Sequence, residues 1–475
     1  MLEHLTPDIC VIGAGSGGLS VAAAAAAFGV DVVLVERGKM GGDCLNYGCV
    51  PSKAMIAAGK RAHAMRTASA FGIEQVDPAI DFSAVHAHVR SVIDAIAPND
   101  SVERFESLGV KVIKAEGRFV DERTLEAGGH RISARRFVIA TGSSPIIPPI
   151  PGIDSVEALT NETIFDFEHR PDHLVIVGGG PIGLELAQAH RRLGSRVTVV
   201  EAAGFLSRED PDLAAIALGA LREEGIALLE RHSVVRIERT DDGLRLVARS
   251  EHGVERIVEG SHLLVAAGRS PNLAALALDA AKVRHDKKGI AVDAGLRSSN
   301  RRIYAIGDVA GGPQFTHVAN YHAGIAIRAL LFRLPAKADY ASLPRITFLD
   351  PELVQVGLTE AEARKAHGEV RVLTWPVHDN DRAQAERETT GLIKLVADRR
   401  GRVIGVSILA KGASEMGNFW SLALSKKMRV RDLTSFISPY PTMGEIGKRA
   451  AMSYFTDMAR KPVVRRIIRL LRVFG

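Results

Sequence analysis

Two cysteines, Cys44 and Cys49, lie five residues apart in the segment GGDCLNYGCVPSK, and the chain of 475 residues has one other cysteine, Cys10. On a regular α-helix this spacing places the two Cα atoms about 8.7 Å apart, whereas a disulfide tolerates about 7 Å or less. If the two sulfurs bond, the backbone between them must be irregular, which Gly48 and Pro51 permit. We interpret the pair as redox-active. The alternatives are half of a zinc site, which needs about four ligands, and two unrelated buried thiols.

The residues before this pair form a nucleotide-binding pattern. An apolar stretch at 8–12 runs into glycines at positions 13, 15 and 18, and a second apolar stretch at 31–35 ends in Glu36. The missing side chains of a GxGxxG motif let backbone N–H groups and a helix N-terminus approach a pyrophosphate, and an acid after the second strand can bind ribose hydroxyls. Strand, glycines, helix, strand and acid in register predict a Rossmann-like fold.

The same pattern recurs with a constant offset of 165 residues. The first motif, Gly13, Gly15, Gly18 and Glu36, maps onto Gly178, Gly180, Gly183 and Glu201. Two dinucleotide sites in one chain indicate that electrons pass from one cofactor to the other, with the cysteine pair as a third station. Because the pair adjoins the first motif, we assign FAD to that motif and a nicotinamide nucleotide to the second.

Composition and charge limit the class of protein. The chain is 46% hydrophobic and 24% charged, which is typical of a soluble globular protein, and its length suggests about three domains. The N-terminus has no basic segment or cleavage site, and three cysteines are too few for a disulfide scaffold, so we expect a cytoplasmic protein. Residues 460–475 hold six Lys or Arg and no acid, so the rest of the chain has no net charge, which argues against a nucleic-acid partner.

Further segments match a known family. They are the sequences ATG at 140–142, AAGRSPN at 266–272, IYAIGD at 303–308 and FTHVA at 315–319. Together with both glycine motifs and the cysteine segment, they make the chain resemble the flavoprotein disulfide reductases, also called pyridine nucleotide-disulfide oxidoreductases. The resemblance extends from residue 7 to about residue 457. The family includes dihydrolipoamide dehydrogenase and the mercuric reductase catalytic core.

The resemblance implies an α/β architecture with two Rossmann-like dinucleotide-binding domains and a C-terminal α+β dimerisation domain. Residues 1–150 and 273–345 would form the FAD-binding domain, 151–272 the NAD(H)-binding domain, and 346–475 the interface domain with a basic amphipathic tail at 460–475. It also implies a homodimer in which each active site is completed by the partner.

The resemblance implies the following site residues. The catalytic set is Cys44, Cys49, Lys53, Glu185, Tyr440 and Glu445. The FAD-binding set is Gly13, Gly15, Ser16, Gly17, Gly18, Glu36, Arg37, Gly42, Asp43, Lys53, Gly117, Thr141, Gly142, Ser143, Asp308, Thr316 and His317. The NAD-binding set is Gly178, Gly180, Pro181, Ile182, Gly183, Glu185, Glu201, Val234, Gly268 and Arg269. No metal ligand is expected.

The implied mechanism is stepwise: NADH reduces FAD, the reduced flavin cleaves a Cys44–Cys49 disulfide, and the dithiol reduces an acceptor. Cys44 would be the outward-facing interchange thiol and Cys49 the thiolate against the flavin, with its pKa lowered by a helix N-terminus and a nearby cation. Lys53 would pair with Glu185 near the flavin ring. The alternative for these two residues is ordinary surface charge.

Two substitutions depart from the family pattern. Asp43 stands where many members have threonine, next to where flavin phosphates would lie, and we expect it to cap the following helix. Tyr440 stands where dihydrolipoamide dehydrogenase and glutathione reductase carry a histidine, while Glu445 is retained. Tyrosine is a poor base near neutral pH, so an acceptor that needs no base is favoured. The alternative for Tyr440 is a packing aromatic at the dimer interface.

The acceptor is the part of the function that the sequence leaves open. Mercuric reductases end in a cysteine pair, which the sequence 473–475 does not show, and we expect no N-terminal metal-binding domain. The segment NDRA at 380–383 nevertheless resembles mercuric-reductase-like relatives. We therefore expect a metal ion, a disulfide or a quinone as the small-molecule acceptor. The alternatives are a dihydrolipoyl dehydrogenase and a non-catalytic flavin and disulfide redox sensor.

Two further expectations concern the coenzyme and the tail. Glu201 would accept a hydrogen bond from a ribose 2′-hydroxyl and repel a 2′-phosphate, which favours NADH over NADPH, although Arg208 lies close in sequence. Residues 462–474 place apolar side chains on one side of a helix and arginines on the other. This pattern is typical of a helix on an anionic membrane surface, so a peripheral position at the inner membrane surface is one interpretation. A tail packed on its own dimer, or solvated, is the other.

Overall fold

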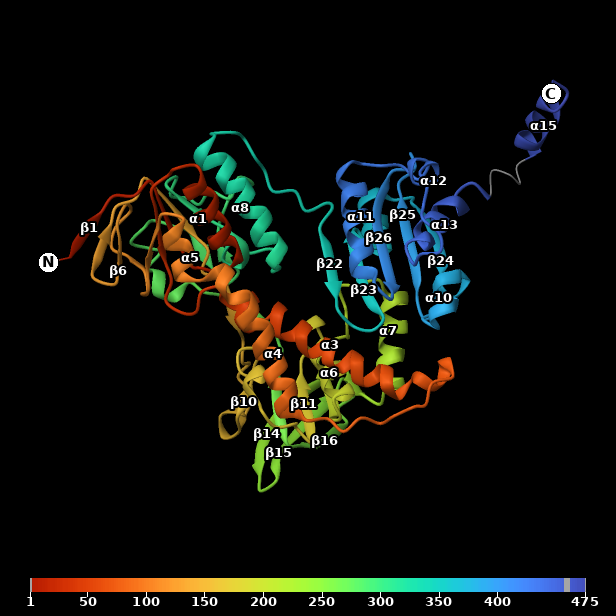
Figure 1. The fold of residues 1–475 in the computed structure, drawn as a ribbon, viewed down its shortest axis with the longest axis horizontal. Helices are drawn as coiled ribbons and strands as arrows, with labels where there is room; N and C mark the ends of the chain where they lie inside the picture. Colours follow the sequence, from red (N-terminus) through yellow and green to blue (C-terminus); the bar gives the residue numbers. More distant parts are fainter. Residues whose placement is uncertain (1, 457–461, 475) are drawn as a thin grey trace.

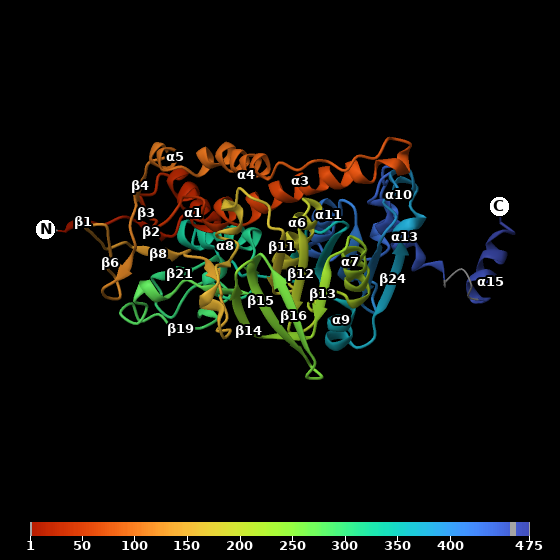
Figure 2. The same cartoon turned by 90° about the horizontal axis from the view of Figure 1, so that it is seen from below.

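The computed structural model describes residues 2–456 and 462–474. The chain forms three domains, seen in Figure 1 as one lobe around α1 and α8, one around β11 and α6, and one around β22 to β26. Helix α15 extends beyond the third lobe in both views (Figures 1 and 2). In the described part of the chain, no helix is long and apolar enough to cross a membrane.

The first domain contains a parallel five-stranded sheet. Its strands follow the order β21-β8-β2-β3-β4, with bounds Ile303–Ala305, Arg136–Ile139, Ile9–Ile12, Val32–Val35 and Val110–Ile113. The central strands are continuous apolar runs because both faces of the sheet are covered. Helices α1 (Ser16–Ala27), α5 (Val102–Ser107) and α8 (Thr316–Leu331) belong to this domain, and a smaller sheet orders β1 (Glu3–Leu5), β7 (His130–Ile132), β6 (Leu125–Ala127) and β5 (Arg118–Phe119).

The second domain repeats this plan. Its parallel sheet has the order β10-β17-β11-β12-β13, with bounds Ala158–Leu159, His262–Val265, His173–Val177, Arg196–Glu201 and Ala227–Glu230. Shifted by 165 residues, the bounds of α1 coincide with those of α6 (Pro181–Arg192). Helix α7 (Pro211–Glu223) and an antiparallel sheet of β14 (His232–Thr240), β15 (Gly243–Ser250) and β16 (Glu255–Gly260) complete the domain. The predicted repeat is therefore a repeat of structure.

Three helices and one ribbon connect the domains. The short α2 (Gly42–Asn46) leads into α3 (Cys49–Arg66), which packs on α4 (Phe82–Ile96) and on α6 of the second domain. The ribbon pairs β9 (Ser143–Pro145) with β18 (Arg269–Pro271), the two places where the chain leaves and re-enters the first domain. A hairpin of β19 (His285–Asp286) and β20 (Gly289–Ile290) follows the ribbon.

The third domain has an antiparallel sheet with helices, as expected. Its order is β22-β23-β26-β25-β24, with bounds Pro344–Thr347, Glu352–Gly357, Val403–Ala410, Leu392–Ala397 and Arg371–Pro376. The helices are α9 (Glu360–His367), α10 (Asp381–Glu386), α11 (Ala413–Ser425), α12 (Asp432–Ser435) and α13 (Glu445–Ser453), followed by α15 (Pro462–Leu471). The predicted α/β fold class, with two dinucleotide-type domains and a C-terminal α+β domain, is confirmed.

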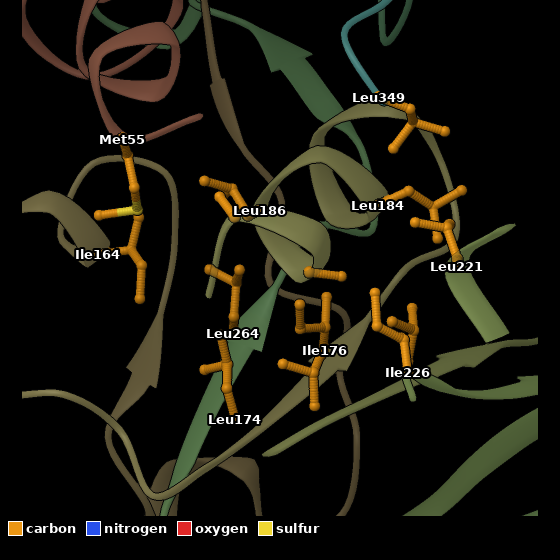
Figure 3. Close-up of a cluster of buried hydrophobic side chains, with 14 of the residues drawn as sticks. Met55, Ile164, Leu174, Ile176, Leu184, Leu186, Leu221, Ile226, Leu264 and Leu349 are labelled. Carbon is orange, nitrogen blue, oxygen red and sulfur yellow. The ribbon is translucent and has the colours of Figure 1, made fainter. Parts of the chain in front are cut away.

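One hydrophobic cluster crosses the domain borders. It joins Met55 of α3 and Leu184 of α6 to the sheet residue Ile176 and to Leu349 at the start of the third domain, and Figure 3 shows these side chains around α6. Because buried apolar area is the main favourable contribution to folding, this cluster holds α3, which begins at Cys49, rigidly against the second domain.

Candidate active site

The two glycine motifs fold into equivalent turns. The Ala14 N–H donates to Glu36 Oε2 at 2.6 Å, and the Gly179 N–H donates to Glu201 Oε2 at 2.7 Å. The second oxygen of each acid accepts from a backbone N–H two residues further along the chain. Each carboxylate is therefore fixed by its own loop, and because a carboxylate oxygen accepts more than one hydrogen bond, each keeps capacity for a ribose hydroxyl.

The glycines of each motif have separate roles. Gly15 and Gly180 are the N-caps of α1 and α6. In the part of the chain that the structure describes, no side chain caps either helix, and no atom lies within 4 Å of where their Cβ atoms would stand. A Cβ on Gly18 or Gly183 would lie 1.9 or 2.1 Å from the carbonyl oxygen of the first glycine of its motif. The middle glycines thus leave both helix N-termini open to a phosphate, and the last glycines allow helix and strand to pack.

A cavity of about 2560 Å³ joins the two turns. From the expected FAD set it is lined by Gly13, Gly15, Ser16, Gly17, Glu36, Arg37, Gly42, Asp43, Lys53, Gly117, Thr141, Gly142, Ser143, Asp308, Thr316 and His317. From the expected NAD set it is lined by Gly178, Gly180, Pro181, Ile182, Glu185, Glu201, Gly268 and Arg269. Gly18, Gly183 and Val234 lie outside the lining; Val234 sits in β14 and packs against a hydrophobic cluster of the second domain. The open helix N-termini at both turns and the volume of this cavity fit two dinucleotides.

Both cysteines of the pair line this cavity. Cys44 belongs to α2 and Cys49 begins α3, because Tyr47 and Gly48 leave helical geometry between them. The predicted irregular backbone is confirmed. All three cysteines are free thiols, and Cys10 is buried in the first domain's core. Among residues 2–456 and 462–474, no three His, Cys, Asp or Glu side chains are placed to hold a metal ion, so the alternative zinc interpretation gains no ligands there.

The environment gives the two thiols opposite protonation preferences. The pKa of Cys49 is lowered to about 6, first because the Cys44 thiol donates a hydrogen bond to it, with help from the Thr316 hydroxyl and the Lys53 charge. Cys49 Sγ lies 3.3 Å from Thr316 Oγ1 at the first turn of α8. The same hydrogen bond, with burial, raises the pKa of Cys44. Near neutral pH Cys49 is the thiolate and Cys44 holds the proton.

Lys53 and Glu185 form the expected pair inside the cavity. Lys53 Nζ lies 2.6 Å from Glu185 Oε2, and the Glu185 side chain is 8% exposed. The Phe348 N–H donates to the other Glu185 oxygen at 2.9 Å, and Lys53 Nζ lies 4.2 Å from the Phe348 ring centre. Glu185 is buried and Lys53 is partly exposed, and the pair has contacts to each other and to Phe348, which disfavours the alternative of ordinary surface charge.

The expectation that Asp43 caps the helix after it is wrong. Helix α3 begins after Gly48 without a side-chain cap. The Asp43 carboxylate instead accepts from Asn161 Nδ2 at 3.0 Å and pairs with Arg269 Nη2 at 3.0 Å. We expected backbone N–H groups as donors, but the guanidinium of Arg269, whose side chain is 12% exposed, is a stronger partner for a carboxylate.

Arg269, expected beside the nicotinamide nucleotide, contacts the FAD side of the cavity. Its guanidinium donates to the Ser143 hydroxyl at 2.8 Å and to the Ser143 carbonyl at 2.7 Å. The Ser143 hydroxyl in turn donates to Asp308 Oδ2 at 2.6 Å. Burial raises the pKa of Asp308, while Ser143 and Arg269 oppose that rise. His317 follows Thr316 on α8, where its Nε2 donates to the Pro344 carbonyl at 3.0 Å.

Tyr440 and Glu445 lie on the third domain, outside this cavity. The Tyr440 side chain is exposed, and its hydroxyl donates to Asp381 Oδ2 at 2.8 Å. This hydrogen bond and the Asp381 charge raise the pKa of Tyr440. Glu445 pairs with Arg449 at 2.8 Å on α13. Within one protomer these residues do not meet the cysteines.

Three contacting residues escaped prediction from the sequence. Phe348 and Asn161 are more than a hundred residues from their partners and match no motif, so no local signal marks them. Asp381 had a signal, since its segment resembled one of the relatives, but its partner Tyr440 is 59 residues away. The cation beside Asp43 could have been predicted, because an acid in a phosphate-binding segment requires a nearby positive charge, and in the structure this charge is Arg269.

The twin turns, the shared cavity and the thiol pair define an oxidoreductase that binds two dinucleotides. Residues 7–323 match the family model described as pyridine nucleotide-disulphide oxidoreductase, and residues 343–451 match its dimerisation domain. The chain belongs to this family and is a pyridine nucleotide-disulfide oxidoreductase. The family implies FAD and a pyridine nucleotide as cofactors.

Similar proteins include two curated enzymes and one crystallised reductase. The chain is 36% identical to a mercuric reductase of Streptomyces lividans, covering 96% of this chain and 98% of that protein. It is 34% identical to a dihydrolipoyl dehydrogenase of Geobacillus stearothermophilus, covering 94% and 95%. A Cu(II) complex of the HOCl-induced flavoprotein disulfide reductase RclA from Escherichia coli superposes with a TM-score of 0.83 at 28% identity, covering 93% and 98%.

Proposed function

We propose that the protein passes electrons from NADH, through FAD and the Cys44–Cys49 pair, to an acceptor that the cysteines contact directly. The observation that carries this proposal is the position of both thiols in the cavity that joins the two glycine turns. Bound FAD would accept a hydride from the nicotinamide and deliver two electrons to the cysteine disulfide, leaving one thiol and one thiolate.

Each half of the cavity would bind one of the two cofactors. The α1 N-terminus, Glu36 and Asp308 would hold FAD, and the α6 N-terminus with Glu201 would hold the nicotinamide nucleotide. Lys53 would place a positive charge beside Cys49 and the flavin, and Glu185 keeps that ammonium in place. The reduced cysteine pair then passes two electrons to the acceptor, and the disulfide forms again as Cys44 loses its proton.

An anaerobic NADH titration tests this proposal. We expect the wild-type protein to take up two electrons more per flavin than Cys44→Ser or Cys49→Ser, because only the wild type contains a reducible disulfide. If all three proteins take up the same number of electrons, the cysteine relay is refuted, and direct reduction of an acceptor by flavin becomes the reaction to examine.

NADH rather than NADPH is the proposed electron donor. The Glu201 carboxylate lines the cavity and would repel a 2′-phosphate, and the Arg208 carbonyl accepts a hydrogen bond from Arg345, which ties this segment to the third domain. We expect kcat/KM to favour NADH, and Glu201→Gln to reduce that preference at least about tenfold, the loss of roughly 1.4 kcal/mol of discrimination. Equal use of both coenzymes by the wild type would contradict the assignment.

A thiophilic metal ion is the proposed acceptor, with a disulfide or a quinone as alternatives. Thiolates prefer soft metals, and the relatives above include a mercuric reductase and a reductase crystallised with Cu(II). The pair of Tyr440 and Asp381 would approach the cysteines from the partner subunit and orient the acceptor there. Mercuric ion, Cu(II), lipoamide and a quinone mixed with reduced protein would be ranked by reoxidation rate; fastest reoxidation by lipoamide would favour the dihydrolipoyl dehydrogenase alternative.

The tail carries a separate proposal, a contact with an anionic membrane surface. At 100° per residue, the apolar side chains of α15 fall within an arc of about 160° and the arginines within an opposite arc of about 100°. The apolar set is Val463, Val464, Ile467, Ile468, Leu470 and Leu471, and the basic set is Arg465, Arg466 and Arg469. None of these apolar side chains is buried against the described residues. Such a helix suits the plane of a bilayer with anionic headgroups.

Vesicle flotation distinguishes this proposal from a solvated or dimer-packed tail. We expect the full chain to float with phosphatidylglycerol vesicles but not with phosphatidylcholine vesicles, and both Ile467→Glu and Arg466→Glu to abolish flotation. Flotation that is independent of lipid charge, or unchanged in both variants, would refute the contact.

A further inference from the structure

Asp43, the residue immediately before Cys44, is tied to a part of the chain far away in sequence. Its carboxylate contacts Arg269 Nη2 and Asn161 Nδ2, each at 3.0 Å. Asn161 Nδ2 also donates to the Tyr47 carbonyl at 3.1 Å, within the break between α2 and α3. Two contacts from one amide therefore fix the redox segment at Asp43, directly before Cys44, and at Tyr47, two residues before Cys49.

Arg269 lies on the ribbon through which the chain passes between the two nucleotide domains. Besides the two hydrogen bonds to Ser143 on β9, its Nη1 donates to Asn161 Oδ1 at 3.2 Å. All of its contacts lie within the border between the domains, and its side chain is 12% exposed. Because an arginine fork loses little entropy for each bond it forms, this arrangement is rigid.

We infer that the Asp43–Arg269 ion pair is a positioning device that locks the redox segment to the interdomain ribbon and cancels a negative charge beside the thiols. Threonine at position 43 could not form the ion pair and would leave the Arg269 charge uncompensated at this place. This inference rests on the proposed function only in that the Cys49 thiolate is taken to act in the redox reaction. The ion pair and its contacts are present whether or not the protein turns over a substrate.

The charged and polar groups around Cys49 determine whether a substitution raises or lowers its pKa. Facing it are the Cys44 thiol and Asp43 on α2, Lys53 on α3, and the Thr316 hydroxyl on α8. Asp43 opposes a thiolate at Cys49, whereas Lys53, which pairs with Glu185 on α6, favours it. Arg269 is the cation that offsets Asp43.

The test measures the pH dependence of iodoacetamide alkylation of Cys49 in the reduced holoprotein, together with thermal unfolding. We expect Arg269→Gln to raise the midpoint and Asp43→Asn to lower it, each on the order of half a pH unit, which is the size of one charge several ångströms away at intermediate dielectric. The double variant should return close to the wild-type midpoint. Each single variant should also melt at a lower temperature.

Two further variants separate charge from position. Arg269→Lys keeps the charge but loses the fork, so we expect a lower melting temperature with little change in the alkylation midpoint. Arg249→Gln breaks an exposed pair with Glu255 on the second domain and should change neither quantity. Midpoints that shift in the same direction in Asp43→Asn and Arg269→Gln, or an Arg269→Gln protein identical to wild type in both measurements, would overturn the inference. Neither result depends on whether NADH is the donor or on which acceptor is used.

Discussion

Cys49 holds its charge through a hydrogen bond from a neighbour rather than through a strong cation. Its pKa of about 6 depends first on the Cys44 thiol and then, among the groups that favour the thiolate, on Thr316 and Lys53. Hydrogen bonds to the charged form of a group stabilise that form. The reactive thiolate is therefore a property of the reduced pair as a unit, and each cysteine determines the chemistry of the other.

Thr316→Val tests this at the residue scale. Loss of the hydroxyl at 3.3 Å from Cys49 Sγ removes one donor to the thiolate, so the pKa should rise. We expect the alkylation midpoint of Cys49 to move upward from about 6, with Thr316→Ser close to wild type. Fragment-ion mass spectrometry assigns the label to Cys49 or Cys44. An unchanged midpoint in Thr316→Val would show that Thr316 serves packing alone.

Buried His190 should make part of the unfolding free energy depend on pH in the acid range. It is fully buried on α6 and stacks on Phe82, and neither ring nitrogen has a hydrogen-bond partner among the described residues. Burial lowers its pKa from 6.5 to about 4, so the folded protein keeps it neutral while the unfolded chain protonates. This contribution to the unfolding free energy is fully present above pH 6.5, is lost progressively as the pH falls below 6.5, and is gone below about pH 4. The difference in pKa corresponds to about 3 kcal/mol.

We therefore expect His190→Leu to lose less unfolding free energy between pH 7 and pH 4.5 than the wild type does. Urea unfolding at the two pH values measures the difference. His252→Leu is the matched control, because His252 is exposed and should leave the pH dependence unchanged. Identical acid losses in wild type and His190→Leu would place the sensitivity elsewhere, for example at His322, whose pKa burial also lowers to about 4.

At the scale of elements, the two glycine turns offer a paired test. A Cβ on Gly18 or Gly183 would collide with the carbonyl oxygen of the first glycine of its motif and push α1 or α6 off its sheet. We expect Gly18→Ala to lose FAD and Gly183→Ala to keep FAD but lose reduction by NADH, measured by flavin absorbance and stopped-flow reduction. Gly219→Ala in α7, where a Cβ meets nothing within 4 Å, is the control and should gain about 0.5–1 kcal/mol. Loss of FAD in Gly183→Ala would contradict the division of sites.

The sequence predicted these elements well because their signals are local. The glycine spacings, the apolar strands and the constant offset fixed both parallel sheets and the break before Cys49. What it predicted wrongly or missed depends on contacts between residues far apart in the sequence: Asp43 with Arg269, Glu185 with Phe348, and Tyr440 with Asp381. Hydrogen-bond partners more than 50 residues apart leave no periodicity, so only the folded chain reveals them.

At the scale of the whole molecule, buried ion pairs join the second domain to the third. Lys394 on β25 is buried and contacts Asp210, Asp212 and Glu360, and Arg192 on α6 pairs with Glu224 and Asp350. Removing one partner of a buried pair leaves an uncompensated charge. The second domain is thereby fixed to the third, which matches the family's dimerisation domain.

Lys394→Met should therefore destabilise the protein by about 3–5 kcal/mol, because Asp210 is 0% exposed and would lose its cation. Calorimetry should show the second and third domains unfolding at a lower temperature, and Lys394→Met with Asp210→Asn should recover part of the loss. The exposed pair Arg231 and Glu251 is the control, and Arg231→Gln should change stability by less than about 1 kcal/mol. A loss below that value in Lys394→Met would show that the pair is not needed.

The exposed apolar surface of the third domain lies close to Tyr440, which we propose completes the site of the partner subunit. The third domain exposes several large apolar side chains, which are Phe419, Leu422, Phe436, Ile437 and Met452. Ile437, 94% exposed, lies three residues before Tyr440, so a partner that covers this surface would also receive the Tyr440–Asp381 pair. We expect Ile437→Asp to shift the protein toward monomer in sedimentation velocity.

Complementation tests whether the partner supplies Tyr440. Cys44→Ser lacks the interchange thiol and Tyr440→Phe lacks the hydroxyl that contacts Asp381, so each homodimer should reduce the acceptor poorly. A mixed dimer contains one site with an intact Cys44 from one chain and an intact Tyr440 from the other only if the two residues meet across the interface. Co-expressed, separately tagged chains purified as mixed dimers should then regain roughly half of the wild-type rate, since one of two identical sites is whole. Mixed dimers no more active than the mean of the two parents would place Tyr440 outside the site and leave it a packing residue.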